Sequence, residues 1–179
     1  MVGQSMGAHT ALLVAARRPD VVGRLVMVEG DLGGGGAAAA RELHQALVAW
    51  PERFDSYAHL RDFFGGDTER GRVWAQAYEP RPDGWWPRFD RRVMEAVMAP
   101  IFHDEWWQAW SSLRAATLLV LAERSNIDTG RVDRMCQLRP DTQRVIVTGA
   151  GHDLHLEQPD AWITALRQYL STTPMPTDH

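Results

Sequence analysis

The sequence has no lysine and only one cysteine. All 19 basic residues are arginine, which excludes Schiff-base chemistry and a serine–lysine dyad, because both need a lysine amine. Cys136 alone cannot form an internal disulfide or provide a cysteine framework for a metal. We therefore expect no metal and no cofactor, and a reducing, cytoplasmic location.

Long apolar runs and a strong charge of one sign are also missing. The longest apolar runs, such as 118–122, are far shorter than the about 20 residues that cross a bilayer. The N-terminus lacks a basic flank followed by a signal-like apolar stretch. The formal net charge is −4, so we expect no membrane and no nucleic acid as partner. A small, uncharged or weakly charged molecule is the expected ligand.

Strand-like and helical segments alternate along the chain. The 179 residues are 45% hydrophobic and 23% charged, as in a soluble globular protein. Apolar, strand-like runs occupy 24–29, 117–122 and 144–148, and helical periodicity follows the second and third of them. This alternation predicts an α/β fold with a parallel sheet and right-handed crossovers.

A long helical segment interrupts this alternation. Four consecutive glycines at 33–36 mark a linker, and the following periodicity predicts roughly four short helices up to about residue 113. Most tryptophans fall in this part of the chain, where they either line an apolar pocket or form the core of a small helical subdomain. The expected division is 1–32, 33–113 as an inserted helical cap, 114–171, and 172–179 as a flexible tail.

The segment Gly3–Gly7 has the spacing of a nucleophile elbow, the tight strand-to-helix turn that lifts a serine hydroxyl clear of a sheet. Ser5 is the expected nucleophile. We expect glycine at positions 3 and 7 because strand and helix pass closely on either side of a strained serine. The Met6 backbone N–H, at the start of the following helix, is the expected oxyanion donor. The alternative is an ordinary glycine-rich turn with an inert serine.

Two segments near the ends of the chain resemble the α/β-hydrolase family. The run Gly-Gln-Ser-Met-Gly-Ala-His-Thr-Ala-Leu (3–12) resembles its elbow and following helix. The run Gly-Ala-Gly-His-Asp-Leu-His-Leu-Glu-Gln-Pro (149–159) resembles its histidine loop and the start of its last helix. Segments 24–29 and 117–122 match the two strands between them, and the insertion looks like a cap. The resemblance implies the C-terminal part of a hydrolase sheet, with helices on both faces.

The resemblance makes His152 the general base that takes the Ser5 proton. His155 shares the loop and is the competing candidate, although the Gly-His pair of the family falls on His152. His9, on the helix after the elbow, is expected to be a packing or pocket residue. The remaining histidines show no ligand spacing and are expected at the surface or in the cap: His44, His59, His103 and His179.

The acid of the triad departs from the family pattern. The position that aligns with the usual aspartate holds Asn126, and Asp128 lies two residues later. Asp128 is our first choice, because it preserves the chain order Ser, Asp, His. Glu123 is a second possibility. A subset of the family takes its acid from the loop after the earlier strand, where this chain offers Glu29 and Asp31.

The resemblance implies a serine hydrolase that acts through an acyl-enzyme on an ester, thioester or activated carbon–carbon bond of a small apolar substrate. A serine at the elbow argues against dehalogenase and epoxide hydrolase chemistry, which need a carboxylate nucleophile. The alternative is a non-catalytic ligand-binding relative with a degenerate triad, as Asn126 suggests.

The first half of the hydrolase fold has no counterpart in this sequence. We expect a sheet of three strands in which 24–29 presents an unpaired apolar edge. A fragment of a longer hydrolase with little or no esterase activity is the expected explanation. A homo-oligomer would be another way to cover that edge.

Overall fold

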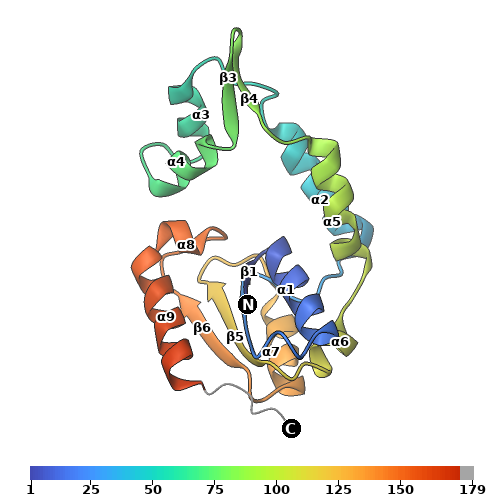
Figure 1. Ribbon diagram of the computed structural model, residues 1–179. Coiled ribbons are helices and arrows are strands. Elements are labelled where there is room, and N and C mark those ends of the chain that lie inside the picture. The colour runs from blue at the N-terminus through green and yellow to red at the C-terminus, as the bar shows by residue number, and fades with distance from the viewer. Residues whose placement is uncertain (174–179) are drawn as a thin grey trace. The chain divides into compact units, whose positions relative to one another are not determined.

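The computed structural model describes residues 1–173, which form two compact units. The first unit combines Met1–Gly33 with the chain from Glu105 onwards, and the second is Gly34–Asp104 (Figure 1). The expected tail at 172–179 falls outside the described residues, except that Thr172 ends the last helix and Thr173 caps it.

The first unit is built on a four-stranded parallel sheet in the order β1-β2-β5-β6. The register pairs Gly3 with Met27, Val26 with Leu118, and Val120 with Val145. The strands are β1 (Val2–Gln4), β2 (Arg24–Val28), β5 (Ala116–Ala122) and β6 (Gln143–Val147). The predicted α/β class is therefore confirmed.

Helices cover both faces of this sheet. Leu25 and Met27 pack with α1 and α7 on one face, whereas Val26 and Val28 pack toward α9 on the other (Figure 1). Successive side chains of a strand point to opposite faces, and helices cover both faces. This explains why β2 is apolar over 25–28 and β5 over 118–122. The helices of this unit are α1 (Met6–Arg17), α6 (Trp107–Ser111), α7 (Thr129–Leu138), α8 (Leu154–Glu157) and α9 (Pro159–Thr172).

The expected three-stranded sheet was wrong. The few residues before Ser5 are enough to form β1, because Val26 N–H donates to Met1 O at 2.9 Å and Ser5 N–H donates to Val28 O at 2.8 Å. The segment 24–29 is therefore an inner strand. Among the described residues, the open edge on this side belongs to β1.

The chain leaves and re-enters the first unit at one place. Gly33 and Glu105 form an isolated antiparallel bridge, and Trp106 N–H donates to Leu32 O at 2.9 Å. The helix α6, which we expected inside the insertion at 33–113, belongs to the first unit. Its Trp110 is fully buried in the core and donates from Nε1 to Met135 O at 2.9 Å.

The second unit has an aromatic core of its own. Phe54, Phe64 and Tyr78 are buried there, with Trp50 and Trp74 packed against them. Besides helices it contains an antiparallel hairpin, which we did not expect. The elements are α2 (Gly36–Ala49), α3 (Tyr57–Phe63), α4 (Glu69–Ala75), β3 (Tyr78–Arg81), β4 (Gly84–Pro87) and α5 (Arg91–His103). Within residues 1–173, no helix is long and apolar enough to cross a membrane.

Tyr169 of α9 gives the first unit a titratable link between helix and sheet. Its hydroxyl donates to Ala116 O at 2.6 Å, and the residue is 2% exposed. Burial raises the pKa of Tyr169 to about 12, although Arg24 and Arg139 oppose the shift. The folded protein therefore keeps the phenol proton at pH values where the unfolded chain loses it, so stability falls as the pH rises.

We expect the free energy of unfolding to decrease between pH 10 and 12 by up to about 3 kcal/mol, because each pKa unit corresponds to about 1.4 kcal/mol. No lysine titrates in this window, since the sequence has none. Urea denaturation at several pH values measures the effect. Tyr169→Phe should reduce the dependence to the part that Tyr78 contributes, because burial raises the pKa of Tyr78 as well. Tyr57→Phe, at an exposed position, should leave it unchanged. The same slope in Tyr169→Phe as in the unsubstituted chain would contradict this account.

Candidate active site

Ser5 occupies a strained turn between β1 and α1. Its φ of 51° and ψ of −120° lie outside the regions that a serine ordinarily adopts. The turn is fixed to the sheet by the hydrogen bond from Ser5 N–H to Val28 O. Ser5 is also the N-cap of α1, yet its side chain makes no capping hydrogen bond. This is the geometry of a nucleophile elbow, with the hydroxyl not engaged in the cap.

The two glycines of the elbow have different roles. A Cβ on Gly3 would lie 2.1 Å from Gly7 O, an impossible contact with rigid backbone. A Cβ on Gly7 would meet nothing within 4 Å. Our expectation of a steric requirement at both positions therefore holds for Gly3 and fails for Gly7. A second close approach follows β2, where a Cβ on Gly30 would lie 2.4 Å from Ala8 Cβ.

The backbone N–H of Met6 begins α1 directly after Ser5. The first N–H groups of a helix have no partner within the helix, and the helix dipole adds partial positive charge there. An oxygen held beside Ser5 would therefore meet both a donor and a favourable field.

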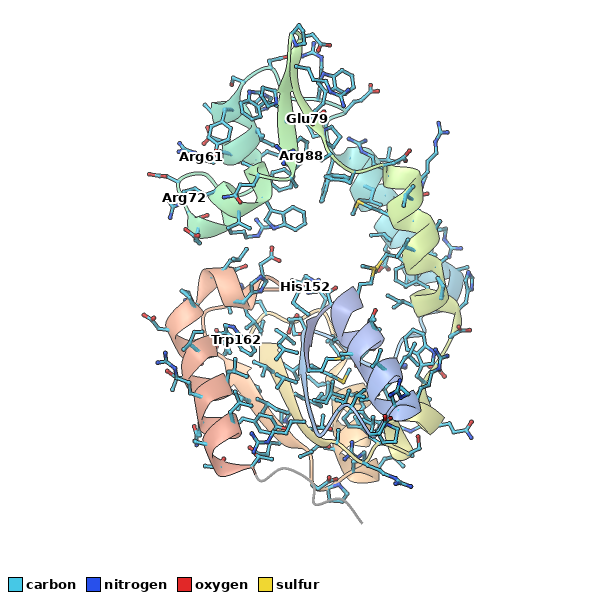
Figure 2. The ribbon with its side chains drawn as sticks, in the orientation of Figure 1. Arg61, Arg72, Glu79, Arg88, His152 and Trp162 are labelled. Atoms are coloured by element: carbon cyan, nitrogen blue, oxygen red, sulfur yellow. The ribbon has the colours of Figure 1, made fainter. Side chains whose placement is uncertain are left out.

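His152 lies in the loop after β6 (Figure 2). It faces a buried carboxylate, with its Nδ1 3.3 Å from Glu29 Oε2. The imidazole is partly open to solvent, with 46% of its side chain exposed, whereas the Glu29 side chain is fully buried. Glu29 directly follows β2 and has a φ of 47°, a second left-handed residue at this edge of the sheet.

Two donors hold the Glu29 carboxylate, one from the last residue of β5 and one from the turn that follows it. Oε1 accepts the Ala122 N–H at 2.7 Å, and Oε2 accepts the Ser125 hydroxyl at 3.1 Å. A buried carboxylate is tolerated only when it is paired and hydrogen-bonded. Glu29 meets this condition, because each of its oxygens accepts a hydrogen bond and Oε2 also faces His152.

The other acid candidates are engaged elsewhere. Asp128, our first choice, caps α7 by accepting the Arg131 N–H at 2.8 Å. Glu123 accepts the Gly149 N–H at 2.8 Å and so supports the backbone of the histidine loop. Asn126 is exposed. The structure therefore brings Glu29, and not Asp128, to His152.

Asp31 belongs to a separate polar cluster. It lies 3.2 Å from His9 Nε2 and 2.8 Å from Arg131 Nε, and it accepts the Gly33 N–H at 2.9 Å. Burial alone would raise the pKa of Asp31, but His9, the Gly33 N–H and the charge of Arg131 together hold it below its ordinary value. His9 is 7% exposed and its ring lies 5.4 Å from Trp106, as expected for a packing residue.

Hydrogen bonds fix the histidine loop on both sides. Gln4 Nε2, next to Ser5, donates to His152 O at 3.2 Å. Glu157 accepts the Gly151 N–H at 2.8 Å. Gln4 therefore links the elbow directly to the loop that carries the imidazole. His155, the competing base, lies on α8 with a buried Nδ1 that has no hydrogen-bond partner among the described residues.

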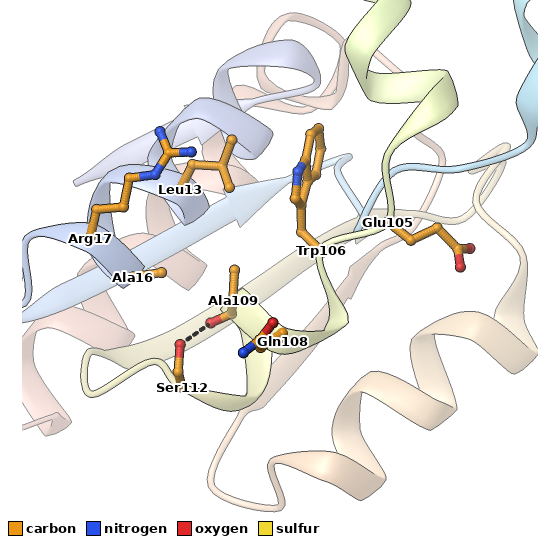
Figure 3. Close-up of a pocket in the computed structure, with 8 residues that line it drawn as sticks. All are labelled: Leu13, Ala16, Arg17, Glu105, Trp106, Gln108, Ala109 and Ser112. Carbon is orange, nitrogen blue, oxygen red and sulfur yellow. Dashed lines mark hydrogen bonds between the residues drawn. The ribbon is translucent and has the colours of Figure 1, made fainter.

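A groove of about 380 Å³ on the first unit lies away from this site (Figure 3). It runs between the second half of α1 and α6, and Ser112 at its rim donates to Ala109 O at 3.0 Å. Its lining includes Leu13, Arg17 and Trp106. Because Ser5 stands at the opposite end of α1, this groove is not part of the candidate site.

Comparison with known proteins places the chain in a family. The model of the Alpha/beta hydrolase family matches residues 1–165. Comparison with curated proteins finds no significant match. The chain therefore belongs to the α/β-hydrolase family. Its parallel sheet, the turn at Ser5 and the histidine loop agree with this membership.

Solved structures share this fold over nearly the whole chain. An E-2-(acetamidomethylene)succinate hydrolase is 23% identical, with a TM-score of 0.82 over 96% of this chain and 66% of its own. The thioesterase domain from the curacin biosynthetic pathway is 22% identical, with a TM-score of 0.70 over 96% and 65%. An esterase from M. tuberculosis is 22% identical, with a TM-score of 0.72 over 96% and 62%. The chain thus spans about two thirds of the length of these proteins.

Proposed function

We propose that this chain carries the catalytic centre of a serine hydrolase, with Ser5 as nucleophile, His152 as base and Glu29 as the acid of the triad. The observation that carries the proposal is the 3.3 Å contact between His152 Nδ1 and the buried Glu29 carboxylate. Glu29 was one of the alternatives from the sequence, and we now prefer it to Asp128, whose carboxylate caps a helix.

The reaction follows from this assignment. With its proton on Nδ1 facing Glu29, the His152 ring presents Nε2 as the acceptor for the Ser5 hydroxyl proton. Ser5 Oγ then attacks the substrate carbonyl carbon, and the Met6 N–H stabilises the negative oxygen that forms. His152 returns the proton to the leaving group, which departs and leaves an acyl-enzyme. Water, activated by His152, then releases the acid and restores Ser5.

The substrate class we propose is an ester, a thioester or a similar small apolar acyl compound. A hydrolase, a thioesterase and an esterase are among the structures with this fold, which supports acyl transfer to water as the type of reaction. Burial of Glu29 supports chemistry of this kind, because a buried carboxylate costs stability and a binding module has no need of one beside a histidine.

Labelling with a fluorophosphonate probe tests the proposal, because such probes react with an activated serine and need no turnover. We expect one covalent adduct on Ser5 of the folded chain, located by peptide mass spectrometry, and none in Ser5→Ala. Ser112→Ala, which removes a hydroxyl that donates to its own helical turn, should be labelled like the unsubstituted chain. A folded chain that stays unlabelled would contradict the assignment of Ser5 as an activated nucleophile.

Three expectations from the sequence stay predictions: that the protein is cytoplasmic, that no nucleic acid is a partner, and that a second copy covers the exposed sheet edge, which we expected at 24–29 and which the structure places at β1. The single cysteine motivates the first, the acidic net charge the second, and the unpaired edge strand the third.

A further inference from the structure

Ser125 is the one hydroxyl that contacts the Glu29 carboxylate among the described residues. It lies in the turn after β5 and donates to Glu29 Oε2 at 3.1 Å, the oxygen that also faces His152 Nδ1 at 3.3 Å. The sequence alone did not single it out, since a serine in a polar loop carries no distinguishing signal.

The direction of this hydrogen bond is fixed by its surroundings. Ser125 Oγ accepts the Ile127 N–H at 3.2 Å, and Ser125 N–H donates to Ala122 O at 3.2 Å. A hydroxyl has a single proton, and the Glu29 carboxylate is the acceptor within its reach. The bond is therefore a charge-assisted one from a preorganised donor, stronger than a bond between neutral groups.

The last torsion of a glutamate is broad, so a carboxylate held through one oxygen can rotate about its bond to Cγ. Ala122 N–H holds Oε1 alone. Adding Ser125 on Oε2 fixes the plane of the carboxylate and leaves the second oxygen aimed at His152. Loss of the hydroxyl would free this rotation while leaving Glu29 buried and charged.

We propose that Ser125 is a positioning residue of the active site. It holds the Glu29 carboxylate so that Oε2 faces Nδ1 of His152 and keeps the imidazole in place. This inference rests on the proposed function. The sequence placed two candidate acids, Glu123 and Asp128, in the turn after β5. The inference gives this turn a different role, because it provides a hydrogen-bond donor to an acid that follows β2.

The test measures how fast a fluorophosphonate labels Ser5 in Ser125→Ala and in Ser125→Thr. Rates at several probe concentrations give the maximal labelling rate and the probe concentration at which the rate is half-maximal. We expect Ser125→Ala to lower the maximal rate by about tenfold, the effect of losing one hydrogen bond to a charged group, without changing the half-maximal concentration. Ser125→Thr keeps the hydroxyl and should recover most of the rate. Ser112→Ala is the matched control and should match the unsubstituted chain.

The Glu29→Gln background separates positioning from a general effect on the loop. If Ser125 acts through Glu29, Ser125→Ala should slow Glu29→Gln by no more than about twofold, because residues that act as a unit are not additive. A further tenfold loss there, or full activity of Ser125→Ala alone, would overturn the inference while leaving the proposed function intact. Absence of labelling in the unsubstituted chain would overturn both, and thermal unfolding confirms that each variant is folded.

Discussion

Glutamine in place of Glu29 is expected to slow the labelling of Ser5 by about 10⁴-fold, because an amide can donate to Nδ1 and so favour the wrong tautomer of the imidazole. In that tautomer Nε2 carries the proton and cannot accept one from Ser5. The substitution is close in volume, so the packing around the buried site changes little. Pseudo-first-order labelling rates, followed by mass spectrometry over long incubations, measure the loss.

Asp128→Asn is the matched control for this experiment. Asp128 caps α7 through one hydrogen bond to the Arg131 N–H, and asparagine is an equally good N-cap. We expect its labelling rate to stay within about twofold of the unsubstituted chain. The reverse result, a large loss in Asp128→Asn and a small one in Glu29→Gln, would return the acid to the position that sequence reasoning preferred.

Gly3→Ala is expected to lower the free energy of unfolding by at least about 3 kcal/mol. Its Cβ would lie 2.1 Å from Gly7 O and 2.4 Å from Gly7 C, so the elbow would have to open by moving backbone, a larger disturbance than ordinary overpacking. Because the same movement displaces Ser5, labelling should be lost even in the fraction that folds. Urea denaturation and the labelling rate give the two measurements.

Gly7→Ala serves as the comparison, since a Cβ there meets open space and the residue is helical. Alanine favours a helix over glycine by roughly 0.5–1 kcal/mol, so we expect equal or slightly higher stability. Equal destabilisation of the two variants would contradict the unequal roles of the two glycines.

The sequence predicted the strand-to-helix turn at Ser5, the α/β class and three of the four strands of the parallel sheet, because these features are local. A glycine-flanked serine before an apolar helix and a continuously apolar run both leave a direct pattern. The choice among carboxylates could not be made in this way. Glu29 and Asp128 both follow parallel strands, so both lie at the carboxyl edge of the sheet, and only the register and the left-handed turn at Glu29 decide which of them meets His152.

The inserted segment was predicted in outline and missed in detail. Trp106, Trp107 and Trp110 were grouped with the cap tryptophans, although α6 packs into the first unit. The hairpin β3–β4 was missed because it contains Pro80 and Pro87. Proline indicates a break in a helical pattern, but it is also tolerated in strands that have no neighbour on one side.

The bridge between Gly33 and Glu105 has a consequence for how this chain can vary. Arg131 reinforces it, because the guanidinium donates to Gly33 O and to Glu105 Oε1 and lies over the ring of Trp107. The two ends of the inserted segment 34–104 are thus held together by contacts between residues of the first unit. The entropy of closing a loop grows only slowly with its length, so segments of other lengths could be grafted between these two residues while Ser5, Glu29 and His152 keep their places.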